Sequence, residues 1–344
     1  MRLEWFYGLR EVRDEWGAAA VTRRSESGGI GPSRRRFCRG AGAFLCCLPG
    51  LRAAAQALRD QPLALVEVAP GMHVAQGSQA EVSRENLGAI ANVGIVIGAH
   101  SVAVIDTGGC LLWGRRLREA VRRVTDRPIS HVIETHMHPD HIFGAAAFLP
   151  DAPVFLGHRN LPAALAARGI YYRRRLEETL GDLAAGSVVV PPTQLVADMV
   201  HLDLGDRVLE VRAHRTAHTD NDLSIFDTAT RTLWAGDLLF LERVPALDGS
   251  LLGWLAVMDE LERLPAVRVV SGHGPAVARW PEALAPQRRY LARLRDEIRG
   301  ALRQGRTMEE AVGTVGATER DKWALFDDYN PRNVTAAFHE LEWE

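Results

Sequence analysis

The sequence predicts a single α/β domain that begins near residue 58 and ends in a short helical extension. Three observations support this prediction. From residue 63 onward, short runs rich in Val and Ile alternate with runs whose apolar residues recur at helical spacing. No linker or change in composition interrupts the chain after residue 57. Finally, five of the predicted strands are followed by His or Asp, and a rigid sheet can hold such side chains around one point.

The overall composition is that of an ordinary globular protein. The chain has 344 residues, of which 47% are hydrophobic and 24% charged, and its formal net charge is −2. This near-neutral balance gives no electrostatic reason to expect nucleic acid as a partner. Three of the four cysteines lie within the first fifty residues. If that segment is removed, Cys110 is the only remaining thiol and no internal disulfide can form.

Residues 1–57 are predicted to be an N-terminal extension that contains a signal peptide. An arginine cluster at residues 34–36 precedes a weakly apolar run at residues 40–51 and the small-x-small sequence Ala55-Gln56-Ala57. This order resembles a twin-arginine signal and predicts export to the periplasm. Since a spanning helix needs about 20 apolar residues, we expect no stable membrane insertion after processing. The alternative is a basic tail in an arginine-rich protein.

The elements of the domain follow from apolar periodicity. A hairpin is expected from residues 90–97 and 101–105. Further strands are expected at residues 129–134, 154–156, 200–204, 208–213, 223–226, 232–235 and 267–270. Helices are expected at residues 114–124, 161–168, 172–183, 251–264, 281–302 and 334–341. We therefore predict a catalytic domain over residues 58–280 and a helical C-terminal extension over residues 281–344, packed on the same domain.

Residues of metal-ligand type follow the predicted strands. In chain order they are Asp106, then His136, His138, Asp140 and His141, then His218, Asp237 and His273. His218 comes shortly after the strand at residues 208–213, and Asp237 follows the strand at residues 232–235. Loops at strand ends commonly carry binding and catalytic residues. We therefore expect these side chains to converge on one site.

The segment His136-Met137-His138-Pro139-Asp140-His141 is the most specific signal in the chain. A lone buried histidine usually serves packing, but three imidazoles and a carboxylate within six residues indicate a metal site. Imidazole nitrogen and carboxylate oxygen suit zinc, and they suit iron or manganese less selectively. One tetrahedral ion takes four ligands. The larger set of candidates therefore favours two ions that share a bridging carboxylate.

This segment resembles the signature of the metallo-β-lactamase superfamily, and the resemblance covers roughly residues 63–275. It implies an αββα sandwich of two mixed β-sheets flanked by helices, with two Zn²⁺ ions per chain. The implied ligands are His136, His138 and His218 for the first ion, Asp140, His141 and His273 for the second, and Asp237 as the bridge. Asp106 is implied to orient a metal-binding loop. Asp222, close after His218, is expected to support a ligand from outside the metal site.

The resemblance also implies a hydrolase in which two metal ions activate water and Asp140 orients that water and handles its proton. A bridging aspartate such as Asp237 is similar to the pattern of glyoxalase II-like thioesterases, lactonases, sulfatases and phosphodiesterases. The segments at residues 140–148, 243–250 and 334–338 resemble the quinoprotein relay system zinc metallohydrolases, which are exported proteins associated with PQQ-dependent oxidation and cytochromes c. They also resemble a hydrolase found among periplasmic sulfur-oxidation proteins.

Two classes of function are consistent with these residues and with the resemblance. The first is a periplasmic enzyme that cleaves an ester, thioester, lactone or amide bond in a small-molecule substrate. The second is a metal-bearing accessory protein that binds a quinoprotein or its cofactor without turnover. In either class, a periplasmic quinoprotein or cytochrome c is an expected partner. The complete ligand set favours the enzyme. No residue of the sequence identifies the physiological substrate.

Overall fold

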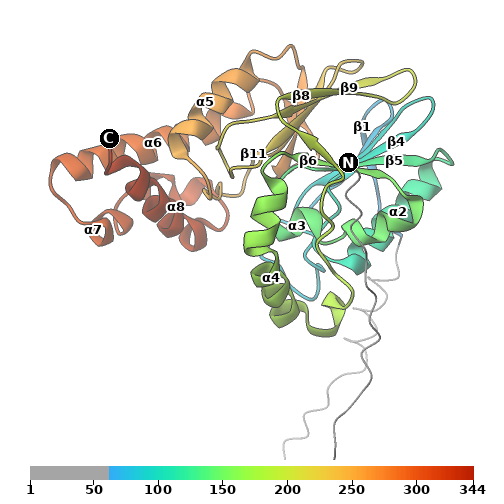
Figure 1. Cartoon of the computed structure of the whole chain (residues 1–344). Helices are drawn as coiled ribbons and strands as arrows, with labels where there is room; N and C mark the ends of the chain where they lie inside the picture. The colour runs from blue at the N-terminus through green and yellow to red at the C-terminus, as the bar shows by residue number, and fades with distance from the viewer. Residues whose placement is uncertain (1–61) are drawn as a thin grey trace, which may run out of the picture. The chain divides into compact units, whose positions relative to one another are not determined.

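The computed structural model describes residues 62–344, so the predicted signal peptide lies outside the described residues. Within residues 62–344, two β-sheets carry helices on their outer faces (Figure 1). The buried side chains between the sheets come from both, for example Ile105 and Ile133 from one sheet and Val211, Ile225 and Trp234 from the other. The predicted α/β fold with two mixed sheets flanked by helices is thus confirmed.

The first sheet has seven strands in chain order. They are β1 (Val66–Ala69), β2 (Met72–Ala75), β3 (Val93–Ile97), β4 (Val102–Ile105), β5 (Ile129–Glu134), β6 (Val154–His158) and β7 (Gln194–Val196). Strands β1 to β4 pair antiparallel, and β4 to β7 pair parallel. Because β4, β5 and β6 are parallel neighbours, the loops after them leave the same edge of the sheet.

The second sheet has six strands in the order β13-β12-β11-β10-β9-β8. They are β8 (Met199–Asp203), β9 (Val208–Ala213), β10 (Leu223–Asp227), β11 (Thr232–Phe240), β12 (Arg268–His273) and β13 (Ala278–Arg279). Only β11 and β12 pair parallel in this sheet. All residues of β11 and all but the first of β12 are buried, as expected for central strands covered on both faces.

Seven α-helices are described. They are α2 (Leu111–Val124), α3 (Pro139–Ile142), α4 (Leu161–Leu180), α5 (Leu251–Glu262), α6 (Leu284–Arg303), α7 (Met308–Val312) and α8 (Phe326–Leu341). Short 3-10 helices are η1 (Ala145–Asp151), η2 (Gly181–Ala184) and η3 (Ala317–Lys322). Helix α2 packs its apolar face on the first sheet. Helices α5, α6 and α8 share a second core with β11.

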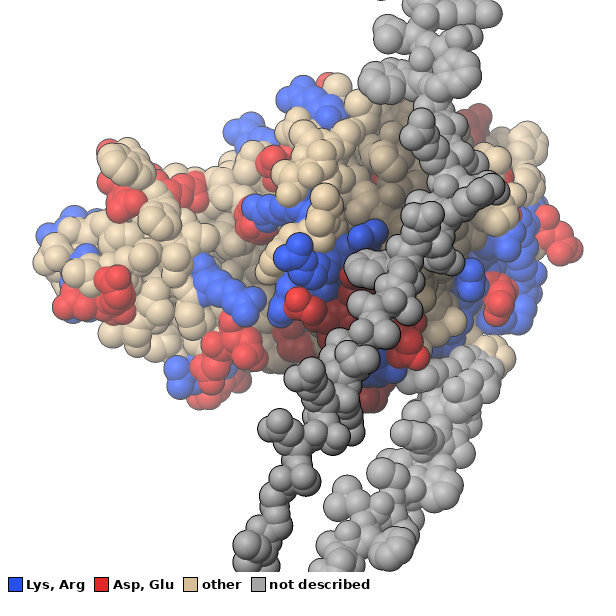
Figure 2. Space-filling view, turned by 60° about the horizontal axis from the view of Figure 1, so that its bottom comes forward, with Lys and Arg blue, Asp and Glu red and all other residues tan. Residues whose placement is uncertain are grey.

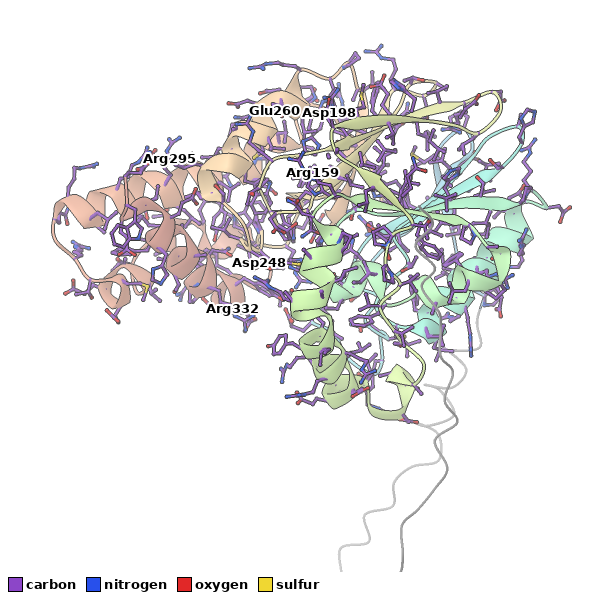
Figure 3. The ribbon with its side chains drawn as sticks, in the orientation of Figure 1. Arg159, Asp198, Asp248, Glu260, Arg295 and Arg332 are labelled. Carbon is purple, nitrogen blue, oxygen red and sulfur yellow. The ribbon has the colours of Figure 1, made fainter. Side chains whose placement is uncertain are left out.

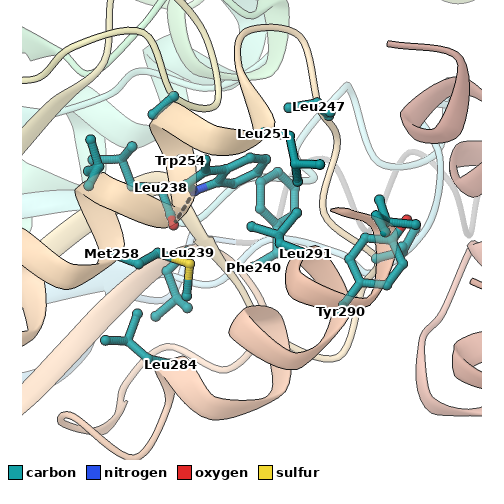
Figure 4. Close-up of a cluster of buried hydrophobic side chains, with 14 of the residues drawn as sticks. Leu238, Leu239, Phe240, Leu247, Leu251, Trp254, Met258, Leu284, Tyr290 and Leu291 are labelled. Atoms are coloured by element: carbon teal, nitrogen blue, oxygen red, sulfur yellow. Dashed lines mark hydrogen bonds between the residues drawn. The ribbon is translucent and has the colours of Figure 1, made fainter. Parts of the chain in front are cut away.

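The core under α5 and α6 is rich in large side chains. Figure 4 shows Trp254 of α5 beside Phe240 and Leu251, with its indole Nε1–H donating to the Leu238 carbonyl oxygen at 2.9 Å. Trp254 is fully buried, and the hydrogen bond removes the cost of burying its polar nitrogen. This core fixes the C-terminal half of β11 and the loop that follows it.

Helix α8 anchors that loop. The side chain of Asn333 donates from Nδ2 to the Pro245 carbonyl at 2.6 Å and accepts the Leu247 N–H at 2.9 Å. The carboxylate of Glu340 accepts from the Ser250 hydroxyl and from the Leu251 N–H, both at 2.6 Å. The helical extension therefore shapes the segment between β11 and α5.

Several predicted boundaries were wrong. The helices expected at residues 161–168 and 172–183 are one continuous helix, α4. Gly169, which lies between the two expected helices, is buried inside α4, and a Cβ there would lie 3.1 Å from a Val189 methyl. The strand expected to end at residue 235 runs on to Phe240, so Asp237 lies inside β11 and does not follow it. Helix α8 begins eight residues earlier than predicted, and strands β1, β2, β7 and β13 and helix α7 were missed.

The surface carries charges of both signs. On the face shown in Figure 2, acidic and basic side chains are interspersed over the described residues, and neither sign dominates the view. In the described part of the chain, no helix combines the length and the apolar character that a membrane-crossing segment requires.

Candidate metal centre

The structure brings together all seven residues predicted to bind metal. They form two groups in which the potential ligand atoms lie within 4.8 Å of one another: one with His136, His138, His218 and Asp237, and one with Asp140, His141 and His273. The residues come from the loop and short helix after β5, the loop after β9, the middle of β11 and the end of β12. Both sheets therefore contribute to one cluster.

Asp237 contacts both groups. Its Oδ2 lies 3.6 Å from His136 Nε2, 3.4 Å from His218 Nε2 and 3.4 Å from His273 Nε2, while its Oδ1 lies 3.1 Å from His141 Nε2. The neighbouring strand makes room for this carboxylate, since a Cβ at Gly272 would lie 1.8 Å from Oδ1. The register between β11 and β12 is irregular at this point. Asp237 is thus placed as a shared carboxylate.

Each of the five histidines is held by an outer partner through one ring nitrogen. These contacts are His136 Nδ1 to Thr135 Oγ1 at 3.0 Å, His138 Nε2 to Asp248 Oδ2 at 3.0 Å, His141 Nδ1 to Asp106 Oδ2 at 2.8 Å, His218 Nδ1 to the Ala246 carbonyl at 2.6 Å, and His273 Nδ1 to the Ile90 carbonyl at 2.8 Å. The other nitrogen of each ring faces another residue of the cluster, as in the 2.9 Å contact between His138 Nδ1 and His218 Nε2. Such outer contacts fix the orientation and tautomer of metal-binding imidazoles.

Three buried polar atoms of the cluster lack a hydrogen-bond partner. They are His136 Nε2, His141 Nε2 and Asp237 Oδ1. The last two lie 3.1 Å apart. Unsatisfied buried polar atoms are costly, and their presence in both groups of the cluster fits bound metal ions, which would satisfy them. The donor set of imidazoles and carboxylates also suits such an ion.

Burial and neighbouring charges set the protonation of the cluster. Burial lowers the pKa of His218 to about 3 and lowers that of His136 well below its ordinary value, which keeps both rings neutral as metal ligation requires. Burial also opposes charge on His141, but the carboxylates of Asp237 and Asp106 outweigh it and raise its pKa. The pKa of Asp237 is lowered despite burial, because His273 and His141 stabilise its charge.

Asp106 connects the loop after β5 to the first sheet. It follows β4, is fully buried, and accepts hydrogen bonds from the Thr135 backbone N–H and hydroxyl, both at 2.8 Å. Its Oδ2 also contacts His141 Nδ1. Burial raises the pKa of Asp106. The side chain therefore orients both the loop after β5 and one imidazole of the cluster.

Asp222 acts on the loop after β9. Its carboxylate accepts from the Thr219 N–H at 2.8 Å and from the Thr219 hydroxyl at 2.6 Å. Burial raises the pKa of Asp222 to about 7. The side chain thus braces the turn next to His218, and its hydrogen bonds go to Thr219 and not to a histidine of the cluster.

Sequence reasoning missed Asp248, which holds His138 from outside. Asp248 lies in the loop between β11 and α5 and also pairs with Arg168 of α4. Burial would raise the pKa of Asp248, but the hydrogen bond to His138 and the positive charges of His138 and Arg168 outweigh burial and lower this pKa. The segment at residues 243–250 resembled known relatives but gave no role for this residue. The contact spans 110 positions in sequence, which no local pattern reveals.

A cavity of about 490 Å³ opens onto the cluster. Asp140, Asp237 and His273 lie in its wall with the apolar side chains of Phe240 and Leu247. The side chain of Asp140 is 12% exposed and lies 3.4 Å from His273 Nε2. The volume is typical of a small-molecule site.

Comparison with known proteins agrees with this geometry. Residues 88–273 match the model of the metallo-beta-lactamase superfamily. A linear primary-alkylsulfatase from Pseudomonas sp. is 24% identical over 254 residues, which cover 63% of this chain and 48% of that protein. The chain therefore spans about half the length of this curated relative.

Solved structures show the same fold. The stereoselective inverting sec-alkylsulfatase Pisa1 from Pseudomonas sp. superposes with a TM-score of 0.62 and 17% identity over 84% of this chain and 54% of that chain. A metallo-beta-lactamase from Pontibacter korlensis superposes with a TM-score of 0.52 and 18% identity over 67% of this chain and 99% of that chain.

The family match spans more than half of the chain and contains the whole ligand cluster. The chain belongs to the metallo-β-lactamase superfamily. The predicted family and fold are therefore confirmed. The predicted class of enzyme, a hydrolase, is also the class of the alkylsulfatases and the lactamase named above.

Proposed function

We propose that this protein is a dinuclear zinc hydrolase that cleaves an ester, thioester, lactone or amide bond in a small-molecule substrate. The observation that carries the proposal is the division of seven donor residues into two groups joined by Asp237, at the wall of a cavity of about 490 Å³. Structural zinc sites take four protein ligands and close the ion off. A larger donor set that lines a cavity fits catalysis better.

In this proposal His136, His138 and His218 hold one ion, Asp140, His141 and His273 hold the other, and Asp237 is shared. Bound zinc supplies a Lewis acid and lowers the pKa of water toward neutrality. Asp140 has the exposure and the position in the cavity wall to orient water and to pass its proton to the leaving group. The cavity walls hold the substrate.

A sulfate ester is the second candidate substrate. The linear primary-alkylsulfatase and the sec-alkylsulfatase Pisa1 favour it, since both are named for this chemistry and share the fold. Cleavage of an alkyl sulfate but of no carboxylic ester would favour this second candidate.

We also propose that the protein works in the periplasm together with a PQQ-dependent quinoprotein or cytochrome c. The support is the order of sequence features in residues 33–57 and the likeness of residues 243–250 and 334–338 to quinoprotein relay hydrolases. Residue Leu247 of the first segment lies in the cavity wall, so this likeness concerns the site itself.

A metal-quantified screen tests the proposal. The zinc-loaded protein should contain two ions per chain by elemental analysis and should hydrolyse at least one of an aryl ester, a thioester, a lactone and an alkyl sulfate. A chelator should abolish the activity and zinc should restore it. Two bound ions without hydrolysis of any substrate would instead support the accessory-protein alternative, and one ion or fewer would overturn the dinuclear site.

A further inference from the structure

Three arginines line the cavity in addition to the candidate metal ligands. They are Arg175 of α4, Arg243 of the loop after β11, and Arg332 of α8. The carboxylates in the same wall that belong to the metal cluster are Asp140 and Asp237. Of the other two lining carboxylates, Asp248 is paired with Arg168 and His138, which leaves Glu81. Arg175 pairs with Glu178 of its own helix. Away from the metal cluster, three arginines therefore line the cavity against two carboxylates.

Arg243 is the most constrained of the three. It is only 3% exposed. One guanidinium nitrogen donates to the Tyr329 hydroxyl at 2.7 Å and to Glu81 Oε1 at 3.3 Å, forming an ion pair, and another donates to the Ala80 carbonyl at 3.5 Å. Its Nε–H is buried without a hydrogen-bond partner in the described structure. The Glu81 carboxylate is about half exposed and also accepts from the Tyr329 hydroxyl at 3.1 Å. Tyr329 and Glu81 thus hold the Arg243 guanidinium in the cavity wall, where its positive charge attracts an anionic ligand.

Arg332 places a second positive charge beside the first. The guanidinium carbons of Arg243 and Arg332 lie 5.0 Å and 5.4 Å from the Tyr329 ring centroid. Among the described residues Arg332 has no ion pair. Figure 3 shows Arg332 near Asp248, between α8 and α4, and both residues line the cavity. Two cations on one aromatic ring repel each other, and an anion bound between them would relieve that repulsion.

These arginines are separate from the reacting centre. Arg243 and Arg332 form no hydrogen bond or ion pair with the seven candidate ligands within residues 62–344. Their contacts run instead through Tyr329 on α8, whose pKa burial raises to about 12. Apolar side chains, among them Ile90, Phe240 and Leu247, line the same cavity. The wall thus offers an apolar surface and a basic patch in addition to the metal cluster.

We propose that Arg243 and Arg332, held together by Tyr329, form an anion-binding subsite. The substrate then carries a carboxylate that is not part of the scissile bond, joined to that bond by a short apolar segment. This inference deepens the proposed hydrolase function and rests on it. It predicts that the hydrolase prefers half-esters of dicarboxylic acids to neutral esters of the same length.

A matched substrate pair tests the subsite. The zinc-loaded full-length chain is assayed with 4-nitrophenyl hydrogen glutarate and 4-nitrophenyl pentanoate, which differ by a terminal carboxylate in place of a methyl group. The anionic ester should show a kcat/KM about 10- to 100-fold higher, the size expected of a charge-assisted hydrogen bond. Arg332→Gln, an exposed position that should fold normally, and Arg243→Gln should each reduce this preference about 10-fold. Arg295→Gln, an arginine of α6 paired with Asp296 outside the cavity, should leave it unchanged.

The outcomes separate this inference from the proposed function. Equal rates on both esters, or a preference that survives Arg332→Gln, would overturn the subsite while the hydrolase stands. Cleavage of an alkyl sulfate but of neither ester would also overturn it, because the bound anion would then be the scissile group. If no ester is cleaved, the hydrolase proposal for esters fails. In that case, the affinity for glutarate is measured by calorimetric titration. An affinity that Arg332→Gln weakens about 10-fold and Arg295→Gln leaves unchanged supports the subsite. Absence of binding overturns it.

Discussion

Glu319 should contribute measurably to the stability of the helical extension that carries Tyr329 and Arg332. Its carboxylate is fully buried in η3. It accepts hydrogen bonds from Arg289 Nε at 3.1 Å, from Lys322 Nζ at 2.8 Å and from the Trp323 indole at 3.2 Å. These contacts join α6 to the segment that precedes α8. The perturbation that tests them is Glu319→Gln, which keeps the shape and removes the charge.

The stability that Glu319→Gln should remove can be worked out from the pKa of Glu319. Burial alone would raise it, but the hydrogen bonds from Arg289, Lys322 and Trp323 outweigh burial and lower it to about 2 from 4.5. At about 1.4 kcal/mol per pKa unit, the shift corresponds to about 3 kcal/mol. The cations are partly exposed, so solvent screening reduces the expected loss to about 2 kcal/mol. Because the folded-state pKa is lowered, this stability is present above pH 4.5 and is lost as pH falls toward 2.

Urea unfolding, monitored by tryptophan fluorescence, measures this loss of stability. Glu319→Gln should lower the free energy of unfolding by about 2 kcal/mol at pH 7, and the difference from the unmodified chain should shrink steadily between pH 5 and pH 3. Glu262→Gln provides the control, because Glu262 is half exposed and pairs with Arg288 at the surface, where a pair contributes about 0–1 kcal/mol. Equal losses for the two variants at pH 7, or a loss for Glu319→Gln that does not change with pH, would refute the reasoning.

The remaining predictions concern metal binding and export. Asp237→Asn should lower the zinc content from two ions toward one by elemental analysis, with hydrolysis reduced by orders of magnitude, whereas Asp106→Asn should cost only about 10- to 100-fold in affinity or activity; full metal content and turnover in the first variant would contradict the bridge. Asp248→Asn should weaken zinc binding about 10-fold in a chelator competition titration, because it loosens the outer partner of a histidine ligand, and unchanged affinity would show the contact to be incidental. Replacing the arginines at residues 34–36 by lysines should retain the protein in the cytoplasm, since twin-arginine receptors distinguish guanidinium from ammonium groups; normal periplasmic processing in fractionated cells would disprove the signal.

The sequence was sufficient to predict the residues of the cluster because their type and spacing are local. The segment from His136 to His141 is recognisable by itself as a metal-binding motif, and runs of apolar residues predict the strands before it. The place of Asp237 was harder to predict. Gly236 and Asp237 are typical turn residues, yet both lie inside β11, where Gly236 adopts a φ of 52° and the register with β12 is irregular. The histidines of the cluster stabilise the buried carboxylate of Asp237. Strand propensities do not include such a contact, so they could not predict a buried aspartate inside β11.

The residues around the cluster could not be predicted from local pattern. Asp248 meets His138 across 110 positions, and Arg243 meets Tyr329 across 86. Such contacts exist only once the sheets and helices are packed. The likeness of residues 243–250 to known relatives marked the segment, but it could not say which side chain faces the metal cluster and which faces the cavity.

The boundary of α8 shows how one local error concealed part of the site. A proline such as Pro331 usually marks a helix boundary, and the predicted helix began after it, at residue 334. The helix in fact runs through Pro331 from Phe326, because tertiary packing outweighs the local preference: Phe326 is buried in the core, and Asn330 accepts a hydrogen bond from the Tyr290 hydroxyl at 2.9 Å.

The turns of α8 that the prediction omitted are the ones that reach the cavity. Tyr329 and Arg332 are three residues apart and therefore lie on the same face of the helix, and both line the cavity. Asn333 comes next and fixes the loop before α5, which carries Asp248. One helical segment thus supplies a wall of the cavity and supports the loop that holds His138. The helical extension is therefore part of the candidate site, and a chain shortened to the sandwich alone would lose both contributions.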